Sequence, residues 1–274
     1  MFLADYHMHS EFSFDGSETI ENMARAAIER NISEIAITDH VELAGGLDCL
    51  WIQNEQKVFR EIDKVRAGTG NLVIRKGMEL GNPHLEPDQA NKICREFDGD
   101  FIIGSVHNLV EGRDVWYYDF SNINCEEFFC EYLDAVMYVA EKSDYDVIGH
   151  ITYPFKGIYQ QKRYVPDFNK YKKQLQKIFE IVVNRGKGIE INTSGLRVDL
   201  RQTLPHRDIL RLYRECGGTY ITIGSDAHKA EEVGEGILQA VEEIRSLGYE
   251  NITTYEKRKP IQHSIVKNAA GDCR

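Results

Sequence analysis

The sequence predicts an α/β protein whose seven strands form a distorted (β/α)7, TIM-like barrel. Seven short apolar segments alternate along the chain with seven segments of helical periodicity, and such alternation is typical of parallel strands. Histidine, glutamate and aspartate residues stand at the carboxyl ends of six of these strands. Those ends meet around one mouth in a closed barrel but lie far apart in an open sheet, so the pattern favours the barrel. We expect one domain over residues 1–274, with a weakly patterned tail from about residue 257.

Each expected strand is a short apolar run, and most end on polar residues. These runs cover residues 4–10, 34–40, 72–79, 101–107, 146–150, 188–192 and 220–228. The helices are recognised by apolar residues spaced i, i+3 and i+4, and Ser17 or Thr19 is expected to cap the first of them. They are expected at residues 17–31, 53–67, 86–97, 126–142, 167–185, 205–216 and 231–247.

Three segments lie outside this alternation. Residues 108–124 and 151–166 are expected to be long loops, and long loops in compact domains are usually functional. Residues 261–266 are expected to add at most a short closing element.

Composition limits the classes of function. The chain has 274 residues, 42% of them hydrophobic, and a formal net charge of -11, which disfavours nucleic-acid binding through a basic face. A small anionic substrate is compatible with that charge if metal ions supply local positive charge. No apolar run approaches the ~20 residues of a membrane span, and no signal peptide is expected. The six cysteines form no CxxC pair, which indicates reduced thiols and a cytoplasmic protein.

The first strand carries His7 and His9, two residues apart. Residues i and i+2 of a strand point to the same face, so both imidazoles are expected to project to one side. A two-histidine clip of this kind indicates a metal site only weakly by itself. The indication becomes strong because the other polar strand ends contribute His40, Glu79, His107, His150, Asp226 and His228.

This inventory of imidazoles and carboxylates exceeds what one ion needs. A structural zinc site takes about four ligands and often uses cysteine, yet no cysteine stands at a strand end. Mixed imidazole and carboxylate ligands suit catalytic Zn, Mn or Fe, and the excess indicates two or three ions. Glu79 is expected to bridge two of them because it is the only glutamate of the set.

Other residues allow two interpretations each. Asp39 is expected either to orient a ligand or to cap a strand end, and Arg197 and Arg163 either bind substrate or are surface charges. Lys156 on its own is more typical of a solvated side chain. Three histidines do not follow the strand-end pattern, and we expect them in a loop, at a helix start and in the tail: His84, His206 and His263.

The strand-end motifs together resemble the polymerase-and-histidinol-phosphatase (PHP) family, in order and over nearly the whole chain. They are His7-x-His9, Thr38-Asp39-His40, Gly77-Met78-Glu79, Gly104-Ser105-Val106-His107, Gly149-His150 and Gly224-Ser225-Asp226-Ala227-His228. The resemblance implies a distorted (β/α)7 barrel with a trinuclear centre of Zn, Mn and/or Fe. Within the family, residues 190–197 look most like those of stand-alone histidinol-phosphate phosphatases.

The resemblance also implies a ligand set for each of three divalent ions. The third set departs from the family, because position 15 is often His in relatives and is Asp here, an oxygen ligand that favours Mn or Fe over Zn. The implied sets are His7, His9, Glu79 and Asp226; Glu79, His107 and His150; and Asp15, His40 and His228.

On this basis we expect a metal-dependent phosphomonoesterase acting on a small phosphorylated substrate, L-histidinol phosphate in histidine biosynthesis. The alternatives are a phosphodiesterase or nuclease on small nucleotides or oligonucleotides, a phosphatase of another phosphomonoester, and a non-enzymatic metal-binding barrel. The complete ligand set disfavours the last. Glu79, Asp226 and Arg197 are the expected catalytic residues, and the expected substrate contacts are Arg197, Arg163, Ser194 and Lys156.

Overall fold

A computed structural model describes residues 1–43, 48–110 and 112–266. Its main sheet has eight strands, all paired in parallel, in the order β1-β2-β4-β5-β8-β9-β10 with β3 added beside β4. The expected parallel α/β architecture is confirmed. The strands are β1 (Ala4–Asp5), β2 (Glu34–Ile37), β3 (His40–Glu42), β4 (Val73–Gly81), β5 (Phe101–Ser105), β8 (Val147–Ile148), β9 (Gly188–Asn192) and β10 (Ile221–Gly224).

Backbone hydrogen bonds join the last strand to the first segment of the chain. The Tyr6 amide donates to Ile223 over 2.9 Å, and the Asp226 amide donates to the His7 carbonyl over 2.7 Å. Met8 and Ala227 form an isolated parallel bridge. The sheet therefore curls into a barrel of the predicted kind, although β1 itself is shorter than the strand expected at residues 4–10.

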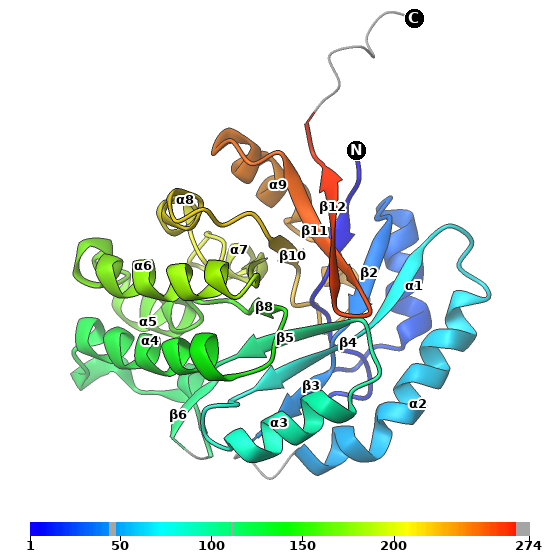
Figure 1. Cartoon of the computed structure of the whole chain (residues 1–274), viewed down its shortest axis with the longest axis horizontal. Coiled ribbons are helices and arrows are strands. Elements are labelled where there is room, and N and C mark those ends of the chain that lie inside the picture. The colour runs from blue at the N-terminus through cyan, green and yellow to red at the C-terminus, as the bar shows by residue number, and fades with distance from the viewer. Residues whose placement is uncertain (44–47, 111, 267–274) are drawn as a thin grey trace, which may run out of the picture.

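Helices surround the strands (Figure 1). Each of the seven expected crossover helices is present, and Thr19 is the N-cap of the first, accepting a hydrogen bond from the Asn22 amide over 3.2 Å. The helix expected at residues 231–247 is divided into a 3-10 turn, η3 (Ala230–Glu232), and α9. The seven are α1 (Ile20–Glu29), α2 (Asp48–Arg66), α3 (Pro87–Glu96), α4 (Cys125–Lys142), α6 (Phe168–Asn184), α8 (Arg207–Glu215) and α9 (Ile237–Ser246).

The two segments expected to be loops contain regular structure. The first holds a short hairpin and two 3-10 turns: β6 (Asn108–Val110), β7 (Arg113–Asp114), η1 (Val115–Tyr117) and η2 (Phe120–Asn122). The second holds α5 (Pro154–Lys162), which begins with a proline in its first turn. A further short helix, α7 (Ser194–Arg197), follows β9.

The tail forms a strand at residues 259–264, which overlaps the short closing element expected at residues 261–266. Strands β11 (Asn251–Glu256) and β12 (Lys259–Ser264) pair as an antiparallel hairpin, which lies beside the N-terminal segment in Figure 1. The Tyr255 ring stacks on Phe101 with centroids 5.0 Å apart, and the Tyr255 amide donates to the Tyr6 hydroxyl over 2.9 Å. Phe101 opens β5, so the hairpin covers the amino-terminal end of the barrel. The opposite end is left for the polar strand ends. Residues 267–274 lie outside the described part of the chain.

Two apolar cores hold these layers together. The larger fills the barrel and the space beneath α4 and α6, and the smaller lies between β2 and helices α1 and α2. Burial of apolar side chains at this scale is the main stabilising term of such a fold. Among the described residues, no helix has the length and apolar character needed to cross a membrane.

Candidate metal centre

The structure brings all nine expected ligands to the carboxyl-terminal end of the barrel. Glu79, near the end of β4, lies at the middle of the group and is buried. Parallel strands in register explain the gathering, because the end of every strand faces the same mouth. The ligand positions are His7, His9, Asp15, His40, Glu79, His107, His150, Asp226 and His228.

The two oxygens of Glu79 face different groups of imidazoles. Oε2 lies 3.3 Å from His7 Nε2 and 3.6 Å from His9 Nε2. Oε1 lies 2.9 Å from His150 Nε2 and 3.2 Å from His107 Nε2. One carboxylate therefore stands between two pairs of nitrogen donors, which is the geometry that a bridging ligand needs.

Asp226 completes the first of these groups. Its Oδ1 lies 3.3 Å from His9 Nε2 and 3.8 Å from His7 Nε2. The residue adopts a left-handed backbone conformation, with φ of 56°. An aspartate tolerates this region better than most residues do, and here it turns the carboxylate toward the histidines of the first strand.

A further group of donors lies at the outer edge of the same cluster. Asp15 Oδ2 is 3.4 Å from His40 Nε2 and 3.1 Å from His228 Nε2. The His9 ring stacks against the rings of His40 and His228, with centroid distances of 4.1 and 4.5 Å. These four side chains, His9 included, offer donor atoms that all lie within 4.8 Å of one another.

The buried polar atoms that lack a hydrogen-bond partner indicate whether this cluster fits metal ions. Four buried side-chain atoms at its centre have no hydrogen-bond partner: His7 Nε2, His9 Nε2, His40 Nδ1 and Glu79 Oε2. Leaving such atoms unpaired in a protein interior costs about 1–3 kcal/mol each. Yet these atoms converge, and His40 Nδ1 lies only 2.9 Å from Glu79 Oε2. Convergent lone pairs on imidazole and carboxylate are what a Zn, Mn or Fe ion requires, so the residues fit a divalent metal.

The protonation states support the same interpretation. Burial lowers the pKa of His7, but the carboxylates of Glu190 and Glu79 outweigh it and hold that pKa well above its usual value. Burial and the neighbouring imidazoles of His40 and His228 lower the pKa of His9 to about 3. His9 therefore keeps its lone pair at neutral pH. Metal binding at the cluster would displace a proton from His7.

Two glutamates that the sequence interpretation did not include hold the ligand rings. Glu190 Oε1 accepts a hydrogen bond from His7 Nδ1 over 2.6 Å, and Glu42 Oε1 accepts one from His107 Nδ1 over 2.6 Å. A carboxylate behind the ring fixes which nitrogen faces the metal. The signal for Glu190 was present in the sequence, since a charged residue inside the apolar strand Gly188–Asn192 is rarely buried without a partner.

Asp39 caps the turn after the first strand, the second of the two roles that the sequence left open. It is buried, its Oδ1 accepts a hydrogen bond from the Ser10 amide over 2.6 Å, and its Oδ2 accepts one from the Ser10 hydroxyl over 2.8 Å. Ser13 donates to the same carboxylate over 3.0 Å, and its hydroxyl accepts a hydrogen bond from the His40 amide over 3.0 Å. Asp39 thus anchors the turn between His9 and Asp15.

A cavity of about 370 Å³ opens directly onto the cluster. Its floor is formed by ligand residues, and its walls come from the segments after β5 and β8. Aromatic rings dominate these walls, together with the carboxylate of Asp114 and the ammonium of Lys156. The aromatic residues are Phe14, Trp116, Tyr117 and Tyr153.

Lys156 is the cation that faces this cavity. Its Nζ donates to the Ser194 hydroxyl over 3.2 Å and lies 5.5 Å from the centre of the Trp116 ring and 5.1 Å from that of Tyr153. Burial lowers the pKa of its ammonium. The sequence-based interpretation of Lys156 as a solvated side chain is wrong, because α5 directs it inward beside α7.

The two arginines expected at the substrate lie elsewhere. Arg197 donates from Nη1 to the Ser225 carbonyl over 2.6 Å and from Nη2 to the Asp226 carbonyl over 2.9 Å. Its guanidinium thus binds the backbone carbonyls at Asp226, and Arg197 does not line the cavity. Arg163 is an exposed residue at the end of α5, paired with Asp199. Neither arginine contacts the cavity in this structure.

A cluster of imidazoles and carboxylates at the carboxyl-terminal mouth of a parallel β/α barrel defines a metal-binding barrel of the class that carries hydrolases. The comparison with known families narrows this class. The PHP domain model matches residues 5–194, and the chain belongs to this family.

Relatives match the chain over nearly its full length. The probable histidinol-phosphatase of Thermotoga maritima is 27% identical over 259 residues, which cover 93% of this chain and 97% of that protein. The histidinol-phosphatase of Lactococcus lactis is 29% identical over 263 residues, covering 93% of this chain and 95% of that protein. The crystal structure of histidinol phosphate phosphatase from Lactococcus lactis, in complex with zinc, L-histidinol and phosphate, has a TM-score of 0.80. It is 27% identical and covers 94% of this chain and 98% of that one.

Proposed function

We propose that this protein is a metal-dependent phosphomonoesterase that hydrolyses L-histidinol phosphate to L-histidinol and phosphate in histidine biosynthesis. The observation that carries the proposal is the converging set of unpaired nitrogen and oxygen donors around Glu79, at the base of an aromatic cavity. The likeness to histidinol-phosphatases over more than nine-tenths of the chain supports the choice of substrate.

We further propose three divalent ions, drawn from Zn, Mn and Fe. When bound, such ions lower the pKa of water to give a nucleophile at neutral pH and neutralise charge on a phosphoryl group. The donor distances support the three ligand sets implied by family resemblance, with Glu79 shared between two of them. His9 lies near enough to Asp15, His40 and His228 to contribute to the third set as well.

In this proposal Lys156 binds the phosphate, and the Ser194 hydroxyl positions the Lys156 ammonium. The ammonium lies against two aromatic faces and one hydroxyl, with no carboxylate of the described residues within ion-pair distance. A desolvated cation with a fixed position stabilises developing negative charge more strongly than one in water. Arg197 then acts through Asp226, whose backbone it holds, and Arg163 has the smallest role of the residues named.

The wall opposite the metal ligands suits the leaving group of histidinol phosphate. That molecule carries an ammonium group and an imidazole ring in addition to its phosphate. Asp114 offers a carboxylate whose two oxygens lie 3.2 and 3.3 Å from the Tyr153 hydroxyl, and Trp116 and Tyr117 offer aromatic faces. Cation recognition by an acid and by aromatic rings has the right chemistry for this group.

Asp226 is not suited to donate a proton to the leaving oxygen. Burial raises the pKa of this carboxyl, but His7 and His9 outweigh burial and hold it well below its usual value. A group that is ionised at neutral pH serves as a metal ligand rather than as an acid. We therefore assign Asp226 to metal binding.

A substrate panel tests the proposal on the metal-loaded protein. Histidinol phosphate, p-nitrophenyl phosphate and a short oligonucleotide are compared by kcat/KM, before and after treatment with a chelator. We expect histidinol phosphate to be preferred and the activity to depend on metal. Faster cleavage of the oligonucleotide would replace the proposal with a phosphodiesterase, and full activity in metal-free protein would overturn it.

A further inference from the structure

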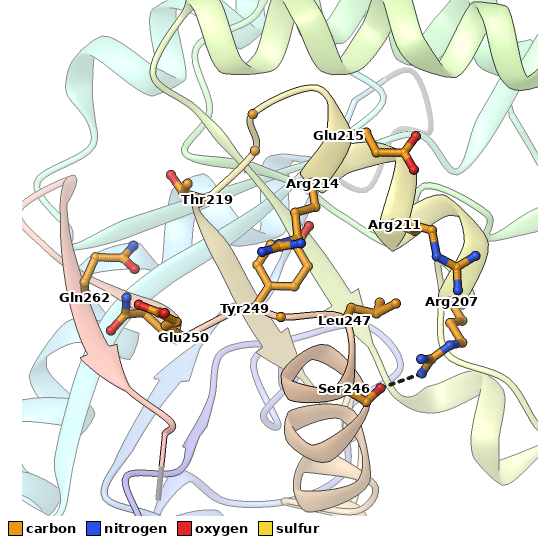
Figure 2. Close-up of a pocket in the computed structure, with 14 residues that line it drawn as sticks. Arg207, Arg211, Arg214, Glu215, Thr219, Ser246, Leu247, Tyr249, Glu250 and Gln262 are labelled. Carbon is orange, nitrogen blue, oxygen red and sulfur yellow. Dashed lines mark hydrogen bonds between the residues drawn. The ribbon is translucent and has the colours of Figure 1, made fainter. Parts of the chain in front are cut away.

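A second and larger cavity, of about 700 Å³, lies away from the metal cluster. It is bounded by the end of α8, by Gly217, Gly218 and Thr219 just before β10, and by the turn between α9 and β11 (Figure 2). The cavity therefore sits at the amino-terminal end of β10, whereas Asp226 and His228 follow its carboxyl-terminal end. With about 3.3 Å per extended residue, Thr219 and Asp226 are separated by roughly 20 Å.

Three arginines of one helix face this cavity. Arg207, Arg211 and Arg214 are spaced i, i+4 and i+7 along α8, which places them on the same side of the helix. Figure 2 shows the side chains of Arg207 and Arg211 next to each other and that of Arg214 over Tyr249. This local gathering of cations is unusual in a chain whose formal net charge is -11.

The positive charge of these arginines is only partly compensated, by Asp208 beside Arg211 and by Glu243, which interacts with Arg207. Arg207 donates to a neutral partner, the Ser246 hydroxyl, over 2.7 Å. Arg211 pairs with Asp208 over 2.7 Å, and both side chains of this pair are about half exposed, where an ion pair contributes little. Among the described residues, no carboxylate lies within 4.0 Å of the guanidinium nitrogens of Arg207 or Arg214.

Arg214 is an exposed side chain whose guanidinium lies over an aromatic ring. Its guanidinium carbon lies 5.9 Å from the centre of the Tyr249 ring, and the Tyr249 hydroxyl is fixed by donation to the Leu210 carbonyl over 2.9 Å. Gly248 lets the guanidinium approach the backbone, because a Cβ atom there would lie 2.9 Å from Arg214 Nη2. The guanidinium therefore lies at the cavity with its planar fork available to an anion.

Two carboxylates also line the cavity, and their placement limits what it accepts. Glu250 lies beside Gln262, on the other side of Tyr249 from Arg207 and Arg211 in Figure 2. Glu215 follows Arg214 at the end of α8 and forms no ion pair with these arginines within 4.0 Å. The arginine side therefore offers a site for negative charge, and the Glu250 side offers hydrogen-bond acceptors for the polar remainder of a molecule.

We propose that this cavity binds the phosphate group of a small phosphorylated molecule, held by Arg207 and Arg214 with Arg211 as a third contact. The planar fork of arginine matches phosphate oxygens in pairs, and a cavity of about 700 Å³ has the size of a site for a nucleotide-sized ligand. The site is separate from the proposed catalytic cavity, so its occupancy does not depend on the proposed function.

Hydrogen–deuterium exchange on the metal-loaded full chain tests this site, because it separates the two cavities by peptide. The probes are inorganic phosphate, pyrophosphate and AMP, each compared with sodium chloride at equal ionic strength. We expect at least one probe to slow exchange in residues 207–219 and 246–251 in a saturable manner. The probe that binds tightest identifies whether a bare phosphate, a polyphosphate or a nucleotide is preferred.

Variants then assign the contacts. Arg207→Gln combined with Arg214→Gln should raise the apparent Kd at these peptides about tenfold or more, as expected for loss of charged hydrogen bonds. Both residues are exposed, so the fold should survive, and unchanged hydrolysis of a phosphomonoester checks this. The matched control is Arg245→Gln on α9, since Arg245 pairs with Glu242 and does not line the cavity.

Two results would overturn the proposal. In the first, no probe protects these peptides beyond the effect of sodium chloride, which would mean that the arginines only balance the negative ends of α8 and α9. In the second, protection occurs but persists unchanged in the double variant. Slower exchange in peptides that contain the candidate metal ligands would report phosphate binding at the proposed catalytic site, and it would say nothing about the arginine cavity.

Discussion

Glu190 offers a sharp test of how the metal cluster is organised. Its Oε1 accepts from His7 Nδ1 over 2.6 Å, and its Oε2 accepts from the His150 amide over 2.8 Å. Both oxygens are therefore acceptors, and the residue is buried. With its Nδ1 proton held by Glu190, the His7 ring turns Nε2 toward Glu79, 3.3 Å away.

The substitution Glu190→Gln keeps the shape and removes one acceptor. The amide of Gln has one oxygen and one NH2 group. In either orientation its NH2 group meets a donor, either the His7 ring N–H or the His150 amide. Loss of one such bond to a buried charged acceptor costs about 1.5–3 kcal/mol, or about ten- to 150-fold in an equilibrium constant. Carboxylates behind metal-bound histidines typically account for about 10–100-fold in metal affinity, so we expect a loss in that range.

The assay is titration of metal into chelator-treated protein, followed by hydrolysis rate and elemental analysis. Glu190→Gln should need about 10–100-fold more metal for half-maximal activity and approach the wild-type rate at saturation. Recovery at high metal concentration distinguishes weaker metal binding from damage to the reaction itself.

The matched control is Glu34→Gln at the other end of the barrel. Glu34 is also buried, and its Oε1 accepts from the Tyr6 hydroxyl and, over 2.8 Å, from Arg75 Nε. This variant should lower the unfolding temperature and leave the metal titration unchanged. The reasoning fails if Glu190→Gln binds metal like the wild type, or if Glu34→Gln weakens metal binding equally.

Four further predictions concern single side chains. Glu79→Gln should lose more than one metal per chain by elemental analysis, because each oxygen faces a different pair of imidazoles. Arg197→Ala should weaken metal binding at Asp226 and lower kcat/KM about tenfold or more, since it removes two charge-assisted bonds to that turn. Lys156→Met should raise the KM for a phosphomonoester. Burial lowers the pKa of the Lys156 ammonium, so the wild-type KM should begin to rise at a lower pH than it would for an exposed lysine. Lys156→Arg should abolish this rise, because the guanidinium stays charged. Burial raises the pKa of Cys94 to about 12, so about one thiol in ten thousand is ionised at pH 8, and mass spectrometry should find Cys94 unmodified by a disulfide reagent until the protein is unfolded.

The gathering of the candidate metal ligands at one end of the barrel could be predicted, because most of them stand at the ends of short apolar runs in the sequence. His107 and His150 each follow a short apolar run, and parallel strands of similar length bring such positions to one mouth. The barrel was predictable for the same reason. The hairpin after residue 250 was not, because Tyr255 and its neighbours gain their stability from contacts with Phe101 and Tyr6, far away in the sequence.

Residues that hold the ligands were harder to recognise than the ligands. Glu42 lies two positions after His40 in β3, and its partner His107 comes from another strand. Only the register between strands brings the two together. A charged residue within an apolar strand, as with Glu190, is a usable sign, because burial of a lone carboxylate is too costly without a partner.

Arg197 shows where reasoning from residue type reaches its limit. A guanidinium next to a glycine-containing turn at the catalytic end of a barrel fits phosphate recognition, and it fits equally well the capping of carbonyl groups. The structure places it on the carbonyls of Ser225 and Asp226, where Asp226 has a left-handed backbone. An aspartate held in that conformation needs its turn fixed from behind, and two donors of one planar group supply this. Of the cations that the sequence suggested as substrate contacts, Lys156 is the one that the structure places at the cavity.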